Sequence, residues 1–318
     1  MTVTKTTSAF ESAARYSAEQ SANIAVKTWA PTGAPQAILQ LNHGMVEYID
    51  RYDEFATTLA ERGWLVVGMD FIGHGDSAPE PDQLGFTGLP LDGPRNVFLE
   101  DMHALRQRVA ADYPELPYFM FGHSMGSFVL RAYLAEHGAG LAGAVISGTG
   151  VMASAMIVGA KAVLGVLGVF HGAEYRSPFF AAMSLGPYNK PFAKGARTEF
   201  DWLSRDPEVV DAYVADDRCG GLFTLAANRC LIDAAARANA AATYAGTPKE
   251  LPLLLVSGAA DPVGGMSAGV EAVADSYRKA GANVTLLLFA DARHELLNEL
   301  NKAEVTTELI AWLEALRP

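Results

Sequence analysis

Residues 122–126 read Gly-His-Ser-Met-Gly, a G-x-S-x-G pattern that can hold a serine hydroxyl in a reactive position. The pattern lies between an apolar run, 118–121, that is typical of a buried strand and a segment with helical periodicity. A sharp strand-to-helix turn strains the backbone at Ser124 and lifts its hydroxyl above the sheet, while Gly122 and Gly126 allow close backbone approach. Glycine-rich turns after strands are usually only structural, but the position between strand and helix favours a nucleophile.

A serine hydroxyl is a weak nucleophile at neutral pH, so it needs a general base and a group that orients this base. Asp261 follows the apolar run 253–258, which predicts a strand, and His294 follows a second such run, 284–289. Both side chains are therefore expected at the carboxyl ends of strands, where functional side chains emerge from parallel sheets. An unperturbed imidazole pKa of about 6.5 suits His294 as the base.

The orienting acid has two candidates. Asp291 lies three residues before His294, and Asp261 could alternatively form only a turn with Pro262. We favour Asp261, because the acid and the base of such a system usually emerge from separate strand ends and meet across space.

Three further histidines follow predicted strands and raise the alternative of a metal site: His43, His74 and His123. The sequence has no H-x-x-x-H or H-E-x-x-H spacing, and His123 has a sufficient structural role inside the serine turn. We therefore expect no metal ligands and no cofactor.

Acyl transfer also needs hydrogen-bond donors for the negatively charged oxygen of its intermediate. The predicted strand 37–42 is followed by His43 and Gly44, and we call residues 43–48 the H-G loop. A loop of this kind supplies one backbone N–H, which we place at Met45. The second donor is expected to be the backbone N–H of Met125, the residue after the nucleophile.

Four stretches of the chain resemble the α/β-hydrolase superfamily, and within it the branch of monoglyceride lipases and lysophospholipases, which includes serine aminopeptidase-like sequences. They are the H-G loop, the segment 70–77, the serine turn 122–126, and Asp261 with His294. The resemblance implies an α/β-hydrolase fold, a mostly parallel central sheet flanked by helices with an inserted helical cap. It also implies a serine hydrolase that cleaves carboxylic esters.

The resemblance favours a monoacylglycerol or a similar lipid ester as substrate. A lysophospholipase or a short-chain carboxylesterase would use the same residues, and an aminopeptidase would need an acidic site for a substrate amine. A protein that only binds ligands would not need the complete set of serine, histidine and aspartate. The branch often has Glu-His where this chain has Glu47 and Tyr48, so a headgroup role of the second residue is not carried over to Tyr48. Glu47 itself is expected either to orient a headgroup hydroxyl or to make a buried structural hydrogen bond.

The length and the alternation of strand and helix patterns fit one α/β domain with an insertion. We expect the core to comprise residues 1–149 and 247–318, and the cap to comprise residues 150–246. The apolar segment 151–170 has the length of a membrane span, but its lysine, its glycines and its place inside a catalytic domain argue against one. It is expected to form a cap helix that lines an acyl-chain pocket, or one that only packs on other cap helices.

The first predicted strand is 24–29. Within the expected cap, the segments 197–206 and 212–217 alternate charged and aromatic residues, a pattern typical of a solvated surface with some packing residues. We assign no catalytic role to them.

The formal net charge is −12 and no basic cluster is present, which disfavours nucleic acid and electrostatic docking on anionic lipid. Neutral lipid substrates and transient apolar contact of the cap with a membrane remain compatible with this charge. Cys219 and Cys230 are too few for a disulfide framework, and the first residues lack the apolar core of a signal peptide. A cytoplasmic location is therefore expected, and nothing in the sequence indicates an oligomeric state.

Overall fold

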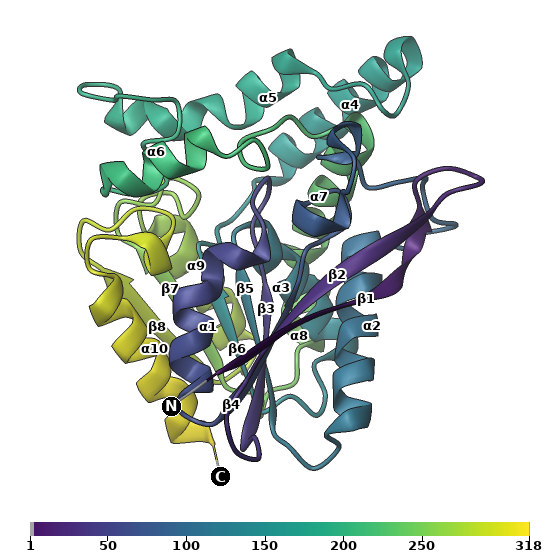
Figure 1. The fold of residues 1–318 in the computed structure, drawn as a ribbon. Helices are drawn as coiled ribbons and strands as arrows, with labels where there is room; N and C mark the ends of the chain where they lie inside the picture. Colours follow the sequence, from purple (N-terminus) through teal and green to yellow (C-terminus); the bar gives the residue numbers. More distant parts are fainter. Residues whose placement is uncertain (1–2, 318) are drawn as a thin grey trace.

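The computed structural model describes residues 3–317. Within this range, eight strands form one sheet in the order β1-β2-β4-β3-β5-β6-β7-β8 (Figure 1). The strands are β1 (Thr4–Arg15), β2 (Ser21–Ala30), β3 (Ala37–Asn42), β4 (Trp64–Met69), β5 (Tyr118–His123), β6 (Gly143–Ser147), β7 (Leu253–Gly258) and β8 (Val284–Phe289). β2 runs antiparallel to β1 and to β4, whereas every other pair is parallel. The predicted mostly parallel sheet is confirmed.

The central strands are buried on both faces, because helices cover both sides of the sheet. One face packs against α1 (Asp53–Ala60) and α10 (Lys302–Leu316). The other face packs against α2 (Val97–Asp112), α3 (Met125–His137) and α9 (Ala268–Lys279). Neighbouring strand residues such as Ile38 and Leu39 belong to opposite cores, so an unbroken apolar run fills both sides.

The strand β1 precedes the first strand that the sequence predicted. Its first six residues, from Thr4 to Ala9, are exposed, and only Phe10, Ser12 and Ala14 are buried, in alternation. A strand at the sheet edge that is mostly polar has little hydrophobic periodicity to reveal it. β1 forms because it pairs along almost its whole length with β2, an interaction that no local pattern reports.

Five helices and one 3-10 helix lie between β6 and β7, and we call residues 150–246 the insertion. They are α4 (Ser154–His171), α5 (Pro178–Ser184), η4 (Gly186–Phe192), α6 (Pro207–Ala215), α7 (Leu225–Ala238) and α8 (Ala241–Gly246). In Figure 1, α4, α5 and α6 form a layer above the sheet, while α7 and α8 reach down beside α3. Shorter 3-10 turns occur elsewhere at η1 (Ile49–Tyr52), η2 (Gly75–Ser77), η3 (Pro81–Gln83) and η5 (Leu296–Asn298).

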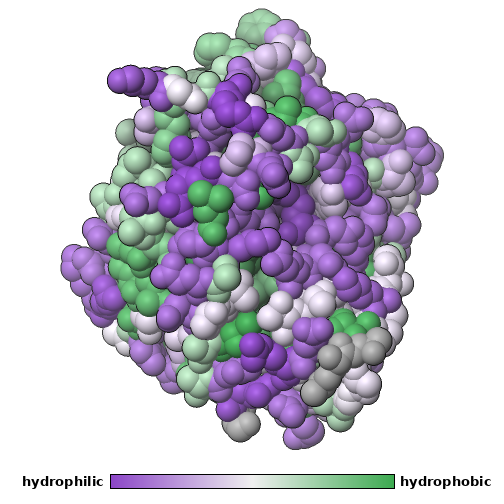
Figure 2. Space-filling model, turned by 60° about the vertical axis from the view of Figure 1, so that its left-hand side comes forward, coloured by the Kyte–Doolittle hydropathy of each residue, from purple (hydrophilic) through white to green (hydrophobic). Residues whose placement is uncertain are grey.

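The helix α4 corresponds to the apolar segment that the sequence singled out. Within residues 3–317 it is the single helix whose length and composition would allow a membrane span, and one such helix is weak evidence for a span. Its inner face packs Leu164 against residues of α5 and α7, and Lys161 forms a salt bridge of 2.5 Å with Asp233. Its outer face is exposed, with Val169 at 83% and Phe170 at 77%. Most of the surface drawn in Figure 2 is hydrophilic. Hydrophobic areas appear at its left side and lower middle, and also at its upper end, the height at which α4 and α5 lie in Figure 1.

Candidate functional site

The serine turn joins β5 to α3, as the sequence predicted. Ser124 has φ 51° and ψ −117°, a conformation that non-glycine residues rarely adopt, and its N–H donates to the Ser147 carbonyl oxygen at 3.0 Å. The Gly126 N–H donates to the His43 carbonyl oxygen at 3.1 Å, and a Cβ at Gly126 would overlap the Asn42 carbonyl oxygen. The turn is therefore held by the neighbouring strands β3 and β6, and glycine is required at position 126.

His294 and Asp261 meet at the carboxyl ends of β8 and β7. The His294 Nδ1 atom lies 3.0 Å from both carboxylate oxygens of Asp261, and both side chains are buried. Asp261 Oδ1 also accepts the Val263 N–H at 2.8 Å, which fixes the carboxylate. Asp291, the rival acid in the sequence, is exposed, and within residues 3–317 the hydrogen bonds and the salt bridge of His294 go to Asp261.

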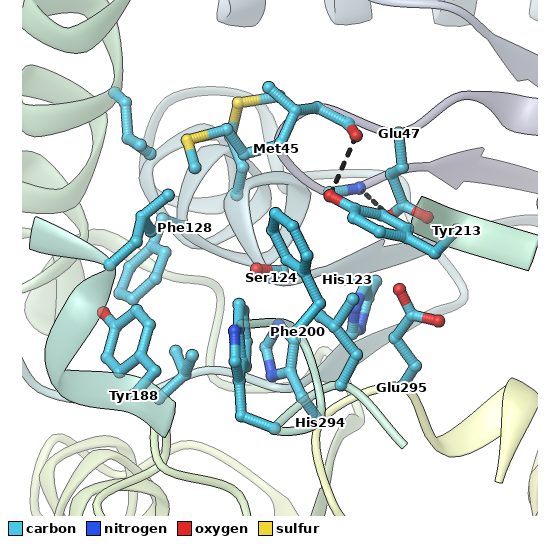
Figure 3. Close-up of a pocket in the computed structure, with 18 of the residues that line it drawn as sticks. Met45, Glu47, His123, Ser124, Phe128, Tyr188, Phe200, Tyr213, His294 and Glu295 are labelled. Carbon is cyan, nitrogen blue, oxygen red and sulfur yellow. Dashed lines mark hydrogen bonds between the residues drawn. The ribbon is translucent and has the colours of Figure 1, made fainter. Parts of the chain in front are cut away.

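The second ring nitrogen of His294 is buried and has no hydrogen-bond partner within residues 3–317. His294 and Ser124 line the same cavity (Figure 3). Hydrogen bonds between a nucleophile and its base are often long before substrate binds, so an unpartnered Nε2 beside Ser124 fits a base that receives a proton during reaction.

Two aromatic rings flank the His294 imidazole. The Trp202 ring centroid lies 5.0 Å from it and the His123 centroid 4.6 Å from it. Burial is the largest single effect and disfavours the charged imidazolium, but the charge and the hydrogen bond of Asp261, together with the charges of Glu295 and Glu47, outweigh it, so the pKa of His294 is raised. Burial lowers the pKa of His123 well below its usual value, which keeps this neighbour neutral when His294 takes up a proton.

The H-G loop presents its backbone to the same cavity. The His43 Nε2 atom accepts the Phe71 N–H at 2.9 Å, so its Nδ1–H donates to the Gly44 carbonyl oxygen at 2.7 Å. In a trans peptide the carbonyl and the following N–H point in opposite directions, so His43 turns the Met45 N–H away from itself. A Cβ at Gly44 would lie 3.2 Å from the Ser124 Cβ, which shows how closely the loop approaches the serine.

The two predicted oxyanion donors, the backbone N–H groups of Met45 and Met125, form no hydrogen bond with the protein within residues 3–317. Both residues line the cavity with Ser124. Met125 is the first residue of α3, where backbone N–H groups are unpaired and the helix dipole favours negative charge. This geometry can bind an oxyanion next to Ser124.

The cavity at Ser124 has a volume of about 80 Å³ and two chemically different ends. In Figure 3, Phe128 and Tyr188 lie on one side of Ser124, and Glu47, Tyr213 and Glu295 lie on the other. Met152 and Val263 pack against Phe128 and belong to the apolar side, and Leu185 and Leu231 also line the cavity. The serine hydroxyl therefore lies between a site for apolar groups and a site for polar groups.

The polar end contains two carboxylates that share one guanidinium. Arg51 donates two hydrogen bonds to Glu295, at 2.7 and 2.6 Å, and one to Glu47 Oε2 at 3.1 Å. Glu47 Oε1 accepts the Tyr52 hydroxyl at 2.8 Å and the Gly44 N–H. Burial raises the pKa of Glu47 to about 7 against the opposing effect of Arg51. Glu47 therefore makes buried structural hydrogen bonds, one of the two alternatives that the sequence left open. The sequence assigned no role to its neighbours Arg51 and Glu295.

Aromatic residues of the insertion line the site, contrary to the solvated surface that the sequence suggested for 197–206 and 212–217. Trp202 and Tyr213 are buried and Phe200 is half-buried, and all three line the cavity. The aromatic residues themselves were the available signal, because the charged residues do not form a separate outward set: Asp201 is buried next to Trp202.

The expectation that the segment 151–170 lines an acyl-chain pocket is wrong for the helix itself. Of the described residues in this segment only Met152, which precedes α4, lines the cavity at Ser124. Val163, Leu164 and Leu167 instead belong to a cluster with Phe180, Leu225 and Ile232. The helix packs on α7 and α5, so its inner apolar face is already occupied.

A second cavity of about 520 Å³ adjoins the first. The two share four lining residues, Val46, Leu185, Phe200 and Trp202. α5, η4 and the segment 220–222 form most of its remaining wall. The hollow part of the insertion is therefore formed by its middle segments rather than by α4.

Comparisons with known proteins agree with this architecture. A monoacylglycerol lipase of Mycolicibacterium smegmatis is 30% identical over 91% of this chain and 92% of its own length. The monoglyceride lipase of Mus musculus is 29% identical over 90% of this chain and 84% of its own length. The crystal structure of a carboxyl esterase from Bacillus coagulans in complex with glycerol superposes with a TM-score of 0.88, at 28% identity and complete coverage of both chains. A sequence model of the family described as serine aminopeptidase, S33, matches residues 33–301. The predicted α/β-hydrolase fold is confirmed, and the chain belongs to the serine aminopeptidase S33 family.

Proposed function

We propose that this protein is a serine hydrolase that cleaves carboxylic esters, with monoacylglycerols and similar lipid esters as its preferred substrates. The observation that carries this proposal is the buried pair of His294 and Asp261 beside the strained Ser124, in a cavity with one apolar and one polar end. The monoacylglycerol lipases among the relatives and the esterase among the structural neighbours support it.

In the proposed mechanism, Ser124 attacks the ester carbonyl while His294 Nε2 takes the hydroxyl proton. Asp261 holds the imidazole through Nδ1 and stabilises the imidazolium that forms. The backbone N–H groups of Met45 and Met125 donate to the tetrahedral oxyanion. His294 then protonates the leaving alcohol. In the second half, water attacks the acyl-enzyme while His294 takes its proton, and His294 returns that proton to the Ser124 oxygen as the carboxylic acid leaves. These steps use only groups of the chain and water.

The charge of the polar end favours a neutral alcohol over a phosphorylated one. Because the pKa of Glu47 is about 7, this carboxylate is partly ionised at neutral pH, and together with Glu295 it carries more negative charge than the single positive charge of Arg51. A phosphate at this end would therefore meet net negative charge. Glu47 Oε2 accepts one hydrogen bond, from Arg51, and retains capacity for one more from a substrate hydroxyl. A glycerol headgroup therefore fits the polar end better than a phosphodiester does, which ranks monoacylglycerol above lysophospholipid.

A short-chain ester is the second candidate, because the cavity at Ser124 is small. Its volume of about 80 Å³ is below the roughly 150 Å³ of an apolar cavity that holds benzene. A long acyl chain must therefore extend beyond this cavity, and the adjoining cavity of about 520 Å³ behind Phe200 and Leu185 offers the space.

A two-way substrate series tests the proposed class. We expect kcat/KM for a monoacylglycerol to exceed that for the lysophosphatidic acid of the same chain by at least about tenfold, since a like-charge contact costs more than about 1.4 kcal/mol. Lysophosphatidylcholine, whose phosphate is accompanied by a cationic choline, serves as the zwitterionic comparison. Acyl chains of four, eight, twelve and sixteen carbons on glycerol separate the lipase from the short-chain esterase. A preference for butyrate esters would favour the esterase, and an equal rate on lysophosphatidic acid would contradict the headgroup argument.

We also propose that the insertion acts as a cap over a core of residues 1–149 and 247–318, and that its outer surface contacts lipid transiently. The exposed apolar residues of α4 and α5 support this contact: Met156, Val158, Val166, Val169, Phe170 and Phe179. Because the net charge is −12, apolar burial rather than attraction to anionic lipid would drive the association. The cytoplasmic location expected from the sequence stays a prediction.

Replacing Val169 and Phe170 together by aspartate should weaken binding to neutral phosphatidylcholine vesicles by at least about tenfold, since each apolar side chain buried is worth about 1.5–3 kcal/mol. Sedimentation with vesicles measures this binding. Leu300→Asp is the matched control, because Leu300 is also an exposed apolar residue, at 63%, but lies outside the insertion. Equal vesicle binding of the wild type and the double variant would remove the contact from α4.

A further inference from the structure

The H-G loop contains a residue whose backbone conformation is unfavourable by itself. Val46 has φ 49°, in the left-handed region that β-branched residues rarely occupy. Such conformations persist only where surrounding contacts impose them. Val46 lies one residue after Met45, the proposed oxyanion donor, so whatever imposes this conformation also sets the path of the donor.

The contacts that hold Val46 come from the insertion. The Val46 carbonyl oxygen accepts the Gly220 N–H at 3.0 Å and the Tyr213 hydroxyl at 3.1 Å. The dashed line at Tyr213 in Figure 3 marks the second of these bonds. Gly220 itself has φ 68°, and a Cβ there would lie 3.2 Å from the Phe200 ring and 3.3 Å from the Tyr213 ring. Two donors that are far from Val46 in sequence therefore converge on one carbonyl oxygen.

A neighbouring cluster fastens the same two segments together. The Tyr48 hydroxyl donates to Asp216 Oδ2 at 2.5 Å and accepts from Arg218 Nη2. The Arg218 guanidinium also lies over the Tyr48 ring, 3.9 Å from its centroid. The segment 213–220 is thus docked on the H-G loop at both Val46 and Tyr48.

The core holds the loop on the other side of the donor. His43 fixes the Gly44 carbonyl oxygen and the Glu47 carboxylate accepts the Gly44 N–H. The Met45 N–H lies between these core contacts and the insertion contacts at Val46. If the Val46 carbonyl were released, the valine could relax to negative φ, and the peptide units on either side of Met45 would rotate with it.

We propose that Tyr213 and Gly220 are positioning residues that hold the H-G loop in its active conformation through the Val46 carbonyl oxygen. The oxyanion site is then complete only while the segment 213–220 is docked on the loop. This inference rests on the proposed function, since it assigns the Met45 N–H to the oxyanion.

Tyr213→Phe tests the inference, because it removes one donor and keeps the ring. A trifluoromethyl ketone that adds to Ser124 measures oxyanion binding, and a glycerol monoalkyl ether, which cannot form an oxyanion, measures ground-state binding. We expect the inhibition constant of the ketone to rise about 3- to 10-fold, the range of one net hydrogen bond, and kcat/KM for p-nitrophenyl acetate to fall by the same factor. The inhibition constant of the ether should stay within about twofold, because the ring still lines the cavity.

Val46→Gly supplies the readout that a merely structural role would not change. Glycine adopts positive φ without the penalty of valine, so the loop needs less help to keep its conformation. The loss caused by Tyr213→Phe should therefore shrink to within about twofold in the Val46→Gly background, whereas independent effects would multiply. Tyr133→Phe is the matched control, because it removes a buried tyrosine hydroxyl that bonds His103 and Arg106 away from the cavity, and it should leave both inhibitors unaffected.

An unchanged ketone constant in Tyr213→Phe would overturn the inference. Equal weakening of the ketone and the ether would also overturn it, because Tyr213 would then bind substrate directly. The same loss in the valine and glycine backgrounds would reduce Tyr213 to an ordinary structural contact and so reject the positioning role. Failure of the proposed function would look different: the wild type would neither hydrolyse esters nor bind the ketone at Ser124, and both proposals would fall together.

Discussion

Ser124→Ala is expected to lower kcat for ester hydrolysis by about 10⁴- to 10⁶-fold, the range for loss of a nucleophile that acts with its base as one unit. The serine hydroxyl has no hydrogen bond within residues 3–317, so its removal takes no contact from the fold. The backbone bonds of residue 124 to the neighbouring strand remain available to alanine. Steady-state kinetics on a p-nitrophenyl ester measures the loss, with a melting curve to establish that the variant is folded.

His294→Ala should produce a loss of the same order, and the double variant should be little worse than either single variant. Covalent labelling by a fluorophosphonate provides an independent readout, because it should occur in the wild type and disappear in Ser124→Ala. Near-normal turnover in a folded Ser124→Ala protein would remove the proposed mechanism altogether.

Asp261→Asn is expected to lower kcat by about 10⁴-fold, as for the corresponding change in serine hydrolases that use this arrangement. Asp261 accepts a hydrogen bond from His294 Nδ1–H with both oxygens at 3.0 Å, so the proton is held on Nδ1 and Nε2 is left to act as the base. An asparagine amide can donate to Nδ1 and so favour the tautomer in which Nε2 carries the proton. Substrate binding should change little, because the Asp261 side chain does not line the cavity.

Asp291→Asn is the matched control for this prediction. Asp291 lies only three residues before His294, but its side chain is exposed. Its backbone has φ 58°, a conformation that asparagine tolerates well. Its replacement should change kcat by less than about twofold, as for surface substitutions generally. If Asp291→Asn showed the larger loss, the acid would be Asp291 and the geometry at the strand ends would have been misinterpreted.

The sequence was sufficient to predict that Ser124, Asp261 and His294 follow the ends of strands, because each comes after a short apolar run that is typical of a strand. In a parallel sheet all such strands end at the same edge, so residues distant along the chain are expected together without knowledge of the packing. The H-G loop was predictable for the same reason, since it follows β3. These signals are local. β5 and β7 are buried on both faces and therefore strongly apolar, whereas β8, which precedes His294, is only partly buried but still carries a short apolar run.

Only the tertiary structure decided which other residues surround Ser124. β1 depends on pairing with β2, α4 turned its apolar face to α7 rather than to the cavity, and Trp202 and Tyr213 came from segments with a surface-like composition. Periodicity along a helix or loop tells which side chains share a face, but not which neighbour that face meets. The hydrogen bonds of Tyr213 and Gly220 to Val46 could not be predicted for the same reason. They join residues far apart in the chain, through the Tyr213 hydroxyl, the Gly220 N–H and the Val46 carbonyl oxygen. The residues of the proposed chemistry were thus indicated by local sequence, whereas the shape and polarity of the site were determined by long-range packing.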